Sequence, residues 1–90
     1  MTLTIERTSG RRRTRIRLSG EFRADHIDQV KAELRNSRPP VALDLAEVGL
    51  VDVECIQFLN NCEADGIPAQ HCSPYVRKWM SRERREKERI

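Results

Sequence analysis

Apolar and polar side chains alternate over the first twenty residues of the chain. Residues 3–6 read LTIE and residues 13–18 read RTRIRL, so every second side chain is apolar or small. A period of two predicts β-strands with one buried face and one face exposed to water. Turn-forming residues at Thr8-Ser9-Gly10 join the two strands into a hairpin, and Ser19-Gly20 is expected to end the second.

The next segment changes to a helical period. Ala24, Ile27, Val30 and Leu34 recur at the spacing of one helix face. Pro39-Pro40 ends the pattern, because proline disfavours helical backbone in the residue before it and lacks an amide hydrogen.

A second strand-to-helix unit follows. The sequence VALDL at residues 41–45 is short, apolar and typical of a central strand. We expect a loop through Gly49, and then Asp52 as the N-cap of a helix that runs to Asp65-Gly66.

The remainder of the chain predicts one more strand and one more helix. IPAQHC at residues 67–72 is expected to be the strand, and Ser73-Pro74 is a typical N-cap and first helical residue. Tyr75, Val76, Trp79 and Met80 give this helix an apolar stripe. The glutamates of the tail that follows favour pairs with lysine and arginine within the helix; they are Glu83, Glu86 and Glu88.

These elements predict an α/β fold of the order β-β-α-β-α-β-α, with a four-stranded mixed sheet and helices packed mainly on one face. We expect one domain at residues 1–80 and a charged helical tail at residues 81–90. The predicted core is formed by Ile16, Leu18, Ile27, Val30, Leu34, Val41, Leu43, Leu45, Ile56, Leu59, Ile67, Val76 and Trp79.

Charge is distributed unevenly along the chain, whose net charge is +3. Residues 1–20 carry six arginines and one glutamate, residues 21–76 four basic and ten acidic residues, and residues 77–90 seven basic and three acidic residues. An acidic middle therefore lies between two basic ends. The basic ends could contact the acidic middle of a second copy, which would give a homodimer.

The cysteines and the hydropathy bear on location. Cys55 and Cys62 lie seven residues apart on one helix face, and the third cysteine, Cys72, leaves an odd number, which argues against a disulfide framework. No apolar run approaches the ~20 residues that cross a bilayer, and no signal-peptide pattern is visible. We expect a cytoplasmic protein without a transmembrane segment.

The order and spacing of several short motifs resemble the STAS family, named for sulfate transporters and anti-sigma factor antagonists. They are IRLSGEF after an N-terminal strand, VALDLAEVGLVD running into a helix, and DGIPAQHCSPYVRKWM. The resemblance covers roughly residues 3–83. It implies a sheet of four to five strands with helices against it and no catalysis. We expect no cofactor. In anti-sigma factor antagonists of this type, a partner kinase docks at the start of the helix after the aspartate.

This chain departs from the family pattern at the regulatory position. The family has Asp-Ser-Ser/Thr-Gly, in which a hydroxyl is phosphorylated and docking is disrupted, whereas this chain reads Asp52-Val53-Glu54-Cys55. Val53 cannot be phosphorylated. Asp52 and Glu54 would supply part of a phosphate's charge permanently, while the simpler interpretation is that they are an N-cap and a first-turn acid.

The resemblance directs the candidate partner site to the second helix. Its expected residues are Asp52, Val53, Glu54, Gln57 and Asn61, with Asp44 at the end of its strand ordering the loop. The function predicted is a non-enzymatic module that docks a protein partner, such as an anti-sigma-type kinase or a larger signalling assembly, without a phosphorylation switch.

Two other functions remain open on the sequence alone. The arginine-rich ends favour a nucleic-acid or anionic-lipid binder, although no aromatic platform for stacking bases is visible, so specific nucleic-acid recognition is not expected. The missing hydroxyl is also compatible with a STAS subunit of a lipid-transport complex. Metal is not expected, because the cysteines and histidines lack ligand spacing, and the sequence gives no sign for or against nucleotide binding.

Overall fold

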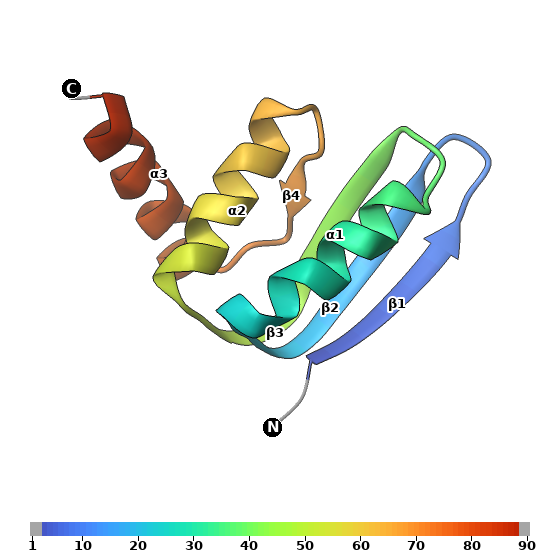
Figure 1. The fold of residues 1–90 in the computed structure, drawn as a ribbon, viewed down its shortest axis with the longest axis horizontal. Coiled ribbons are helices and arrows are strands. Elements are labelled where there is room, and N and C mark those ends of the chain that lie inside the picture. Colours follow the sequence, from blue (N-terminus) through green and yellow to red (C-terminus); the bar gives the residue numbers. More distant parts are fainter. Residues whose placement is uncertain (1–2, 89–90) are drawn as a thin grey trace.

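The computed structural model describes residues 3–88 and contains a mixed sheet flanked by helices (Figure 1). The four strands lie in the order β1-β2-β3-β4. β1 and β2 are antiparallel, whereas β2 with β3 and β3 with β4 are parallel. The predicted fold class is therefore confirmed. The elements are β1 (Leu3–Ser9), β2 (Thr14–Phe22), the 3₁₀-helix η1 (Ala24–His26), α1 (Ile27–Arg35), β3 (Val41–Val51), α2 (Val53–Ala64), β4 (Ala69–Gln70) and α3 (Pro74–Glu88).

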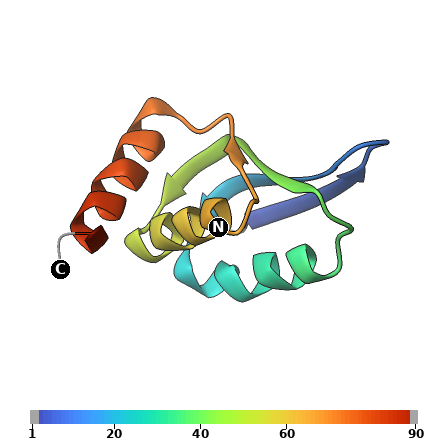
Figure 2. The ribbon, with the colours of Figure 1, turned by 90° about the horizontal axis from the view of Figure 1, so that it is seen from above.

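The helices α1 and α2 cover one face of the sheet, and α3 packs beside α2 on the side away from α1 (Figures 1 and 2). The alternation in the hairpin explains this arrangement. Ile16 and Leu18 of β2 are buried beneath the helices, whereas Arg15 and Arg17 are exposed. The opposite face of β1 and β2 is thus an open, polar surface, as the period of two predicts.

Two strands are longer than the sequence suggests. β2 continues past Ser19-Gly20 to Phe22, and Gly20 adopts a φ of 100° where the register with β3 shifts. β3 continues through Gly49 to Val51, so the expected loop is absent from this segment. Both extensions follow from bulges, which let a strand continue although its alternation is interrupted. β4 is in turn shorter than expected.

The core lies between the sheet and the two helices α1 and α2. Most of the predicted core residues are buried, and four of them, Ile27, Leu34, Ile67 and Trp79, pack partly buried against the cluster. The prediction omitted Phe22, Phe58 and Met80, which are also buried. Cys55 and Cys62 face the core as expected. Tyr75 was expected in the apolar stripe of the last helix and is instead 68% exposed.

The last helix starts where predicted, but residues of its tail contact α2 in addition to their own helix. The backbone N–H of Val76 donates to Ser73 Oγ at 3.2 Å, which is an N-cap. Glu83 and Arg84 make hydrogen bonds to α2, rather than only to neighbours within their own helix. The expected boundary between residues 80 and 81 falls inside α3, and residues 89–90 of the expected tail lie outside the described residues.

Candidate functional site: the outer surface of α2

Asp52 joins the starts of two helices. Its Oδ1 accepts a hydrogen bond from the backbone N–H of Cys55 at 3.1 Å, so it caps α2 as predicted. Its Oδ2 accepts from the backbone N–H of Ala24 at 2.8 Å, at the start of η1. Partial burial raises the pKa of Asp52, but the hydrogen bonds from Cys55 and Ala24, helped by the charge of Arg23, outweigh it and hold the pKa below its usual 3.8. Asp52 is therefore an ionised structural cap.

The environment of the thiol beside this cap disfavours the thiolate form. Cys55 is fully buried in the core. Burial, reinforced by the carboxylate of Asp52, raises the pKa of Cys55 to about 12. Because the thiolate is the nucleophilic form, this environment opposes cysteine catalysis at neutral pH.

Three residues expected to bind a partner form an exposed line along α2. Glu54, Gln57 and Asn61 lie three and four residues apart, which places them on one helix face. All three are exposed, and we call them the α2 ridge. Val53, at the position of the family's hydroxyl, is 43% exposed at the foot of the ridge.

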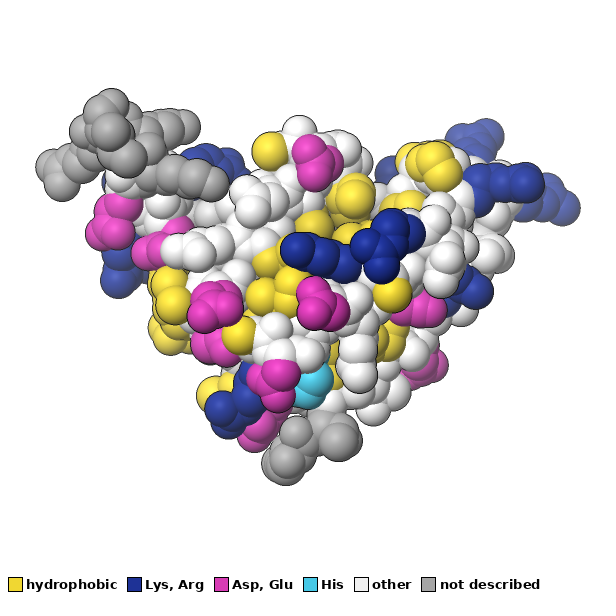
Figure 3. Space-filling model, in the orientation of Figure 1, with side chains coloured by type: hydrophobic (Ala, Val, Ile, Leu, Met, Phe, Trp, Pro, Cys, Tyr) yellow, Lys and Arg dark blue, Asp and Glu magenta, His cyan; other side chains and the backbone are white. Residues whose placement is uncertain are grey.

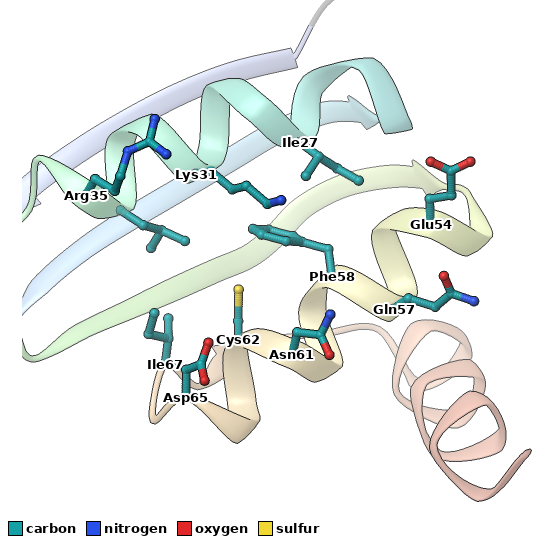
Figure 4. Close-up of a pocket in the computed structure, with 11 residues that line it drawn as sticks. Ile27, Lys31, Arg35, Glu54, Gln57, Phe58, Asn61, Cys62, Asp65 and Ile67 are labelled. Carbon is teal, nitrogen blue, oxygen red and sulfur yellow. The ribbon is translucent and has the colours of Figure 1, made fainter. Parts of the chain in front are cut away.

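A groove of about 800 Å³ separates the ridge from α1 (Figure 4). Apolar residues line its interior. Lys31 and Arg35 contribute positive charge from α1, while Glu54 and Asp65 contribute negative charge from the α2 side. The full lining consists of Ile27, Lys31, Leu34, Arg35, Glu54, Gln57, Phe58, Asn61, Cys62, Asp65 and Ile67.

Phe58 supports the interior of this groove. It is 8% exposed, and its ring meets that of Phe22 edge to face, with centroids 6.0 Å apart and planes at 77°. The contribution of α1 as a wall of the site was not among the sequence-based expectations. The signal was present, since Lys31 and Arg35 are one turn apart beside the apolar stripe of the same helix.

The other flank of α2 is occupied by α3. Glu63 accepts hydrogen bonds from Arg77 at 3.1 Å, from Arg84 at 3.1 Å and from the backbone N–H of Ala69 at 3.2 Å. Burial raises the pKa of Glu63, but the Ala69 N–H and the two guanidinium groups outweigh it and lower the pKa overall. Asn60 adds a hydrogen bond to the carbonyl of Met80 at 2.9 Å.

A smaller hollow of about 610 Å³ remains between α2 and the tail of α3. Gln57 and Asn61 border this hollow as well as the groove beside α1. Gln57 Nε2 also donates to Glu83 Oε1 at 3.2 Å. The α2 ridge is consequently a narrow polar strip between two depressions.

Asp44 lies elsewhere and has a different role from the one expected. It is in the interior of β3 rather than at the end of a strand, and seven residues of extended chain, roughly 20 Å, separate it from Val51. It is only 4% exposed. Its Oδ1 accepts from the backbone N–H of Ala46 at 3.0 Å, and its Oδ2 lies 3.8 Å from Arg17 Nε. Asp44 therefore orders the bulge in β3, where the register with β2 shifts.

Within residues 3–88, no three His, Cys, Asp or Glu side chains gather as a metal site would require. No helix in the described part of the chain is both long and apolar enough to cross a membrane.

Comparison with known proteins gives one family. A family model described as "Mlab, STAS domain" matches residues 5–71, which run from within β1 past the end of β4 and include the whole α2 ridge. No curated protein matches the chain. The match supports a module of the general type found in anti-sigma factor antagonists and sulfate transporters.

Proposed function

Because the chain belongs to the STAS domain family, we propose that it is a non-enzymatic module that docks a protein partner on the α2 ridge and Val53. The observation that carries this proposal is the groove beside the ridge. Its apolar interior lies between positive residues of α1 and negative residues of α2. Such a groove suits a partner segment that is apolar along one side and carries acidic residues on one margin and basic residues on the other.

The proposed docking does not depend on phosphorylation. Val53 has no hydroxyl, and both carboxylate oxygens of Asp52 are engaged by backbone N–H groups. Glu54 is the exposed negative charge in the first turn of α2. The permanent charge at this helix start thus comes chiefly from Glu54, with Asp52 serving as the cap.

The proposed partner is an anti-sigma-type kinase or a component of a larger signalling assembly. The three cysteines are free in the structure, which agrees with a reducing compartment, and we place the protein in the cytoplasm.

A binding experiment with paired variants tests the proposal. The tagged chain is used to isolate its partner from the source cells, and the purified partner is then titrated against two double variants. Gln57→Arg with Asn61→Arg adds bulk and charge to the α2 ridge. Thr4→Arg with Thr8→Arg adds the same charge to exposed positions of β1. We expect the ridge variant to weaken binding at least tenfold and the β1 variant to bind like the natural chain. Equal binding by both variants would place the docking surface elsewhere.

The missing switch is tested separately. Val53→Ser restores the hydroxyl beside the cap. If the partner is a kinase of the family type, incubation with ATP should phosphorylate the Val53→Ser chain and weaken its binding, while leaving the natural chain unchanged. Weakening of the natural chain by ATP would show regulation at another position.

A second candidate function is a STAS subunit of a lipid-transport complex. The observation that favours it is the same valine, since a permanent subunit has no need of a phosphorylated hydroxyl. Stable co-purification with a transport ATPase would support this function, whereas isolation with a signalling kinase would support the first.

A further inference from the structure

A third depression, a small hollow, lies at the opposite end of the molecule from the start of α2. It has a volume of about 370 Å³ and is formed where the turn between β1 and β2 meets the connection from α1 to β3 (Figure 1). Four arginines line it, together with glycine, proline, serine and threonine, and no acidic residue does so. We call these four arginines the arginine pole; they are Arg11, Arg12, Arg13 and Arg38.

Hydrogen bonds hold the two walls of this hollow together. Thr14 Oγ1 donates to the carbonyl of Arg38 at 3.0 Å, and the backbone N–H of Thr14 donates to the carbonyl of Pro40 at 2.9 Å. The N–H of Gly10 donates to the carbonyl of Arg13 at 2.8 Å. A Cβ at Gly10 would lie 3.0 Å from that carbonyl oxygen, so glycine allows the tight turn. The arginines therefore project from a fixed backbone frame.

The positive charge of the arginine pole is uncompensated in the described structure. Residues 7–20 and 34–43 contain no aspartate or glutamate. Among the ion pairs of residues 3–88, none involves a member of the pole, whereas the nearby Arg7 and Arg17 are paired with Glu33 and Asp44. Basic side chains gather at this end in the space-filling view (Figure 3). An anion would relieve the mutual repulsion of the four guanidinium groups.

We propose that the arginine pole binds the phosphate groups of an anionic lipid surface. Guanidinium groups hold phosphate oxygens through paired hydrogen bonds, and one phosphate offers oxygens to several arginines at once. The pole lies at the end of the longest axis of the molecule, and a flat surface can touch it without meeting the rest of the sheet (Figure 1). The contact is electrostatic, because the exposed large apolar residues within residues 3–88, which are Leu50, Val53 and Tyr75, lie outside the hollow.

Two observations favour a surface over a nucleic acid. A long polyanion that continued from the pole along the open face of the sheet would meet the exposed carboxylate of Glu6 beside Arg17, whose own charge is already paired with the buried Asp44. In addition, no aromatic side chain lines the hollow, so bases would have no stacking partner there.

The test uses the full chain and vesicles of phosphatidylcholine with and without phosphatidylglycerol. Each arginine near an anionic surface contributes roughly a fivefold factor to binding. The triple variant Arg11→Gln, Arg12→Gln, Arg13→Gln should therefore bind the anionic vesicles about 100-fold more weakly. A matched control, Lys78→Gln, Arg82→Gln, Arg85→Gln, removes the same charge from exposed positions of α3. It should bind nearly as well as the natural chain, and unfolding curves should show all three chains folded.

A single variant distinguishes a hollow from a simple run of arginines. Arg38→Gln lies on the second wall, far from residues 11–13 in sequence, and should cost about fivefold in vesicle binding. Equal loss in the α3 control, equal binding to neutral vesicles, or no effect of Arg38→Gln would overturn the proposal.

Competition identifies the source of the phosphate. Inorganic phosphate and duplex or single-stranded DNA are added at constant ionic strength. If the chain bound DNA at lower concentrations than it binds the anionic vesicles, the assignment to a lipid surface would be overturned. Tight binding of free phosphate without vesicles would overturn it as well. None of these measurements uses a protein partner, so they can fail independently of docking on the α2 ridge.

Discussion

The two flanks of α2 are built on opposite principles. On the side of α3, Glu63 accepts hydrogen bonds from two guanidinium groups and a backbone N–H, so these polar groups have partners within the chain. On the side of α1, the charges of Lys31 and Glu54 stand at a groove with an apolar interior. A surface whose polar groups already have partners gains little from a further protein. The α1 flank is therefore the side of the ridge that is better suited to bind a partner.

The largest expected effect comes from removing the apolar support of the α1 flank. Phe58→Ala should lower the free energy of unfolding by about 3–5 kcal/mol, because it removes a buried ring and its contact with Phe22. Phe58→Leu should cost less than half as much. Urea titration followed by circular dichroism measures both variants. A loss below about 1 kcal/mol would mean that the ring is not part of the core.

The next effect concerns the α3 flank. Glu63→Gln should cost about 1 kcal/mol, because it removes the carboxylate that Arg77 and Arg84 share, although both guanidinium groups are half exposed to solvent. Glu54→Gln is the matched change on the α1 flank and should stay within about 0.5 kcal/mol of the natural chain. Equal losses in the two variants would remove the difference between the flanks.

A third prediction concerns acid. The pKa values of Asp52 and Glu63 are lowered in the folded state, from ordinary values of 3.8 and 4.5. Their stabilisation is thus complete above those ordinary values and is lost as the pH falls through the lower folded values. The free energy of unfolding should be nearly constant above about pH 5 and should fall steeply below about pH 4.

Asp52→Asn isolates one part of this acid dependence. An amide keeps one acceptor oxygen and turns an NH₂ group toward a second donor, so the variant should lose about 1 kcal/mol at neutral pH. It should also lose less further stability on acidification than the natural chain, measured by urea titration from pH 7 to pH 3. If the free energy of unfolding falls equally in both chains between pH 7 and pH 3, other carboxylates are responsible for the pH dependence.

The smallest effect on stability is expected for Lys31. Lys31→Gln removes an exposed charge from the wall of the groove and should change the free energy of unfolding by no more than about 0.5 kcal/mol. It should nevertheless weaken binding of the proposed partner severalfold, because the charge of Lys31 faces the groove. Unchanged affinity, measured by titration calorimetry, would show that the partner does not reach α1.

Local sequence rules were sufficient for the order of the elements and for the starts of α2 and α3. Asp52 and Ser73 could be identified as caps because capping depends on residues within one turn. The ends of β2 and β3 could not be predicted in this way. Glycine in a strand resembles a turn residue until the neighbouring strand is placed beside it, and Gly20 and Gly49 both lie inside strands.

The candidate site was predictable as a line of residues but not as a shape. The spacing of Glu54, Gln57 and Asn61 places them on one face of any helix. The groove beside them depends on the separation between α1 and α2, which no local pattern specifies. The second bond of Asp52, to Ala24, connects residues 28 positions apart and was equally beyond local reasoning. Asp44 is buried because strand pairing places it in the interior of β3, so its expected position at a strand end was wrong.

The two bonds of Asp52 have a mechanical consequence. One carboxylate fixes the beginning of η1, and hence of α1, at a set distance from the beginning of α2. A negative group introduced at residue 53 would repel this carboxylate and strain both bonds together. In a chain with serine at that position, phosphorylation would consequently alter the spacing of α1 and α2 as well as the local charge. One modified residue would thus change the width of the whole groove between the two helices.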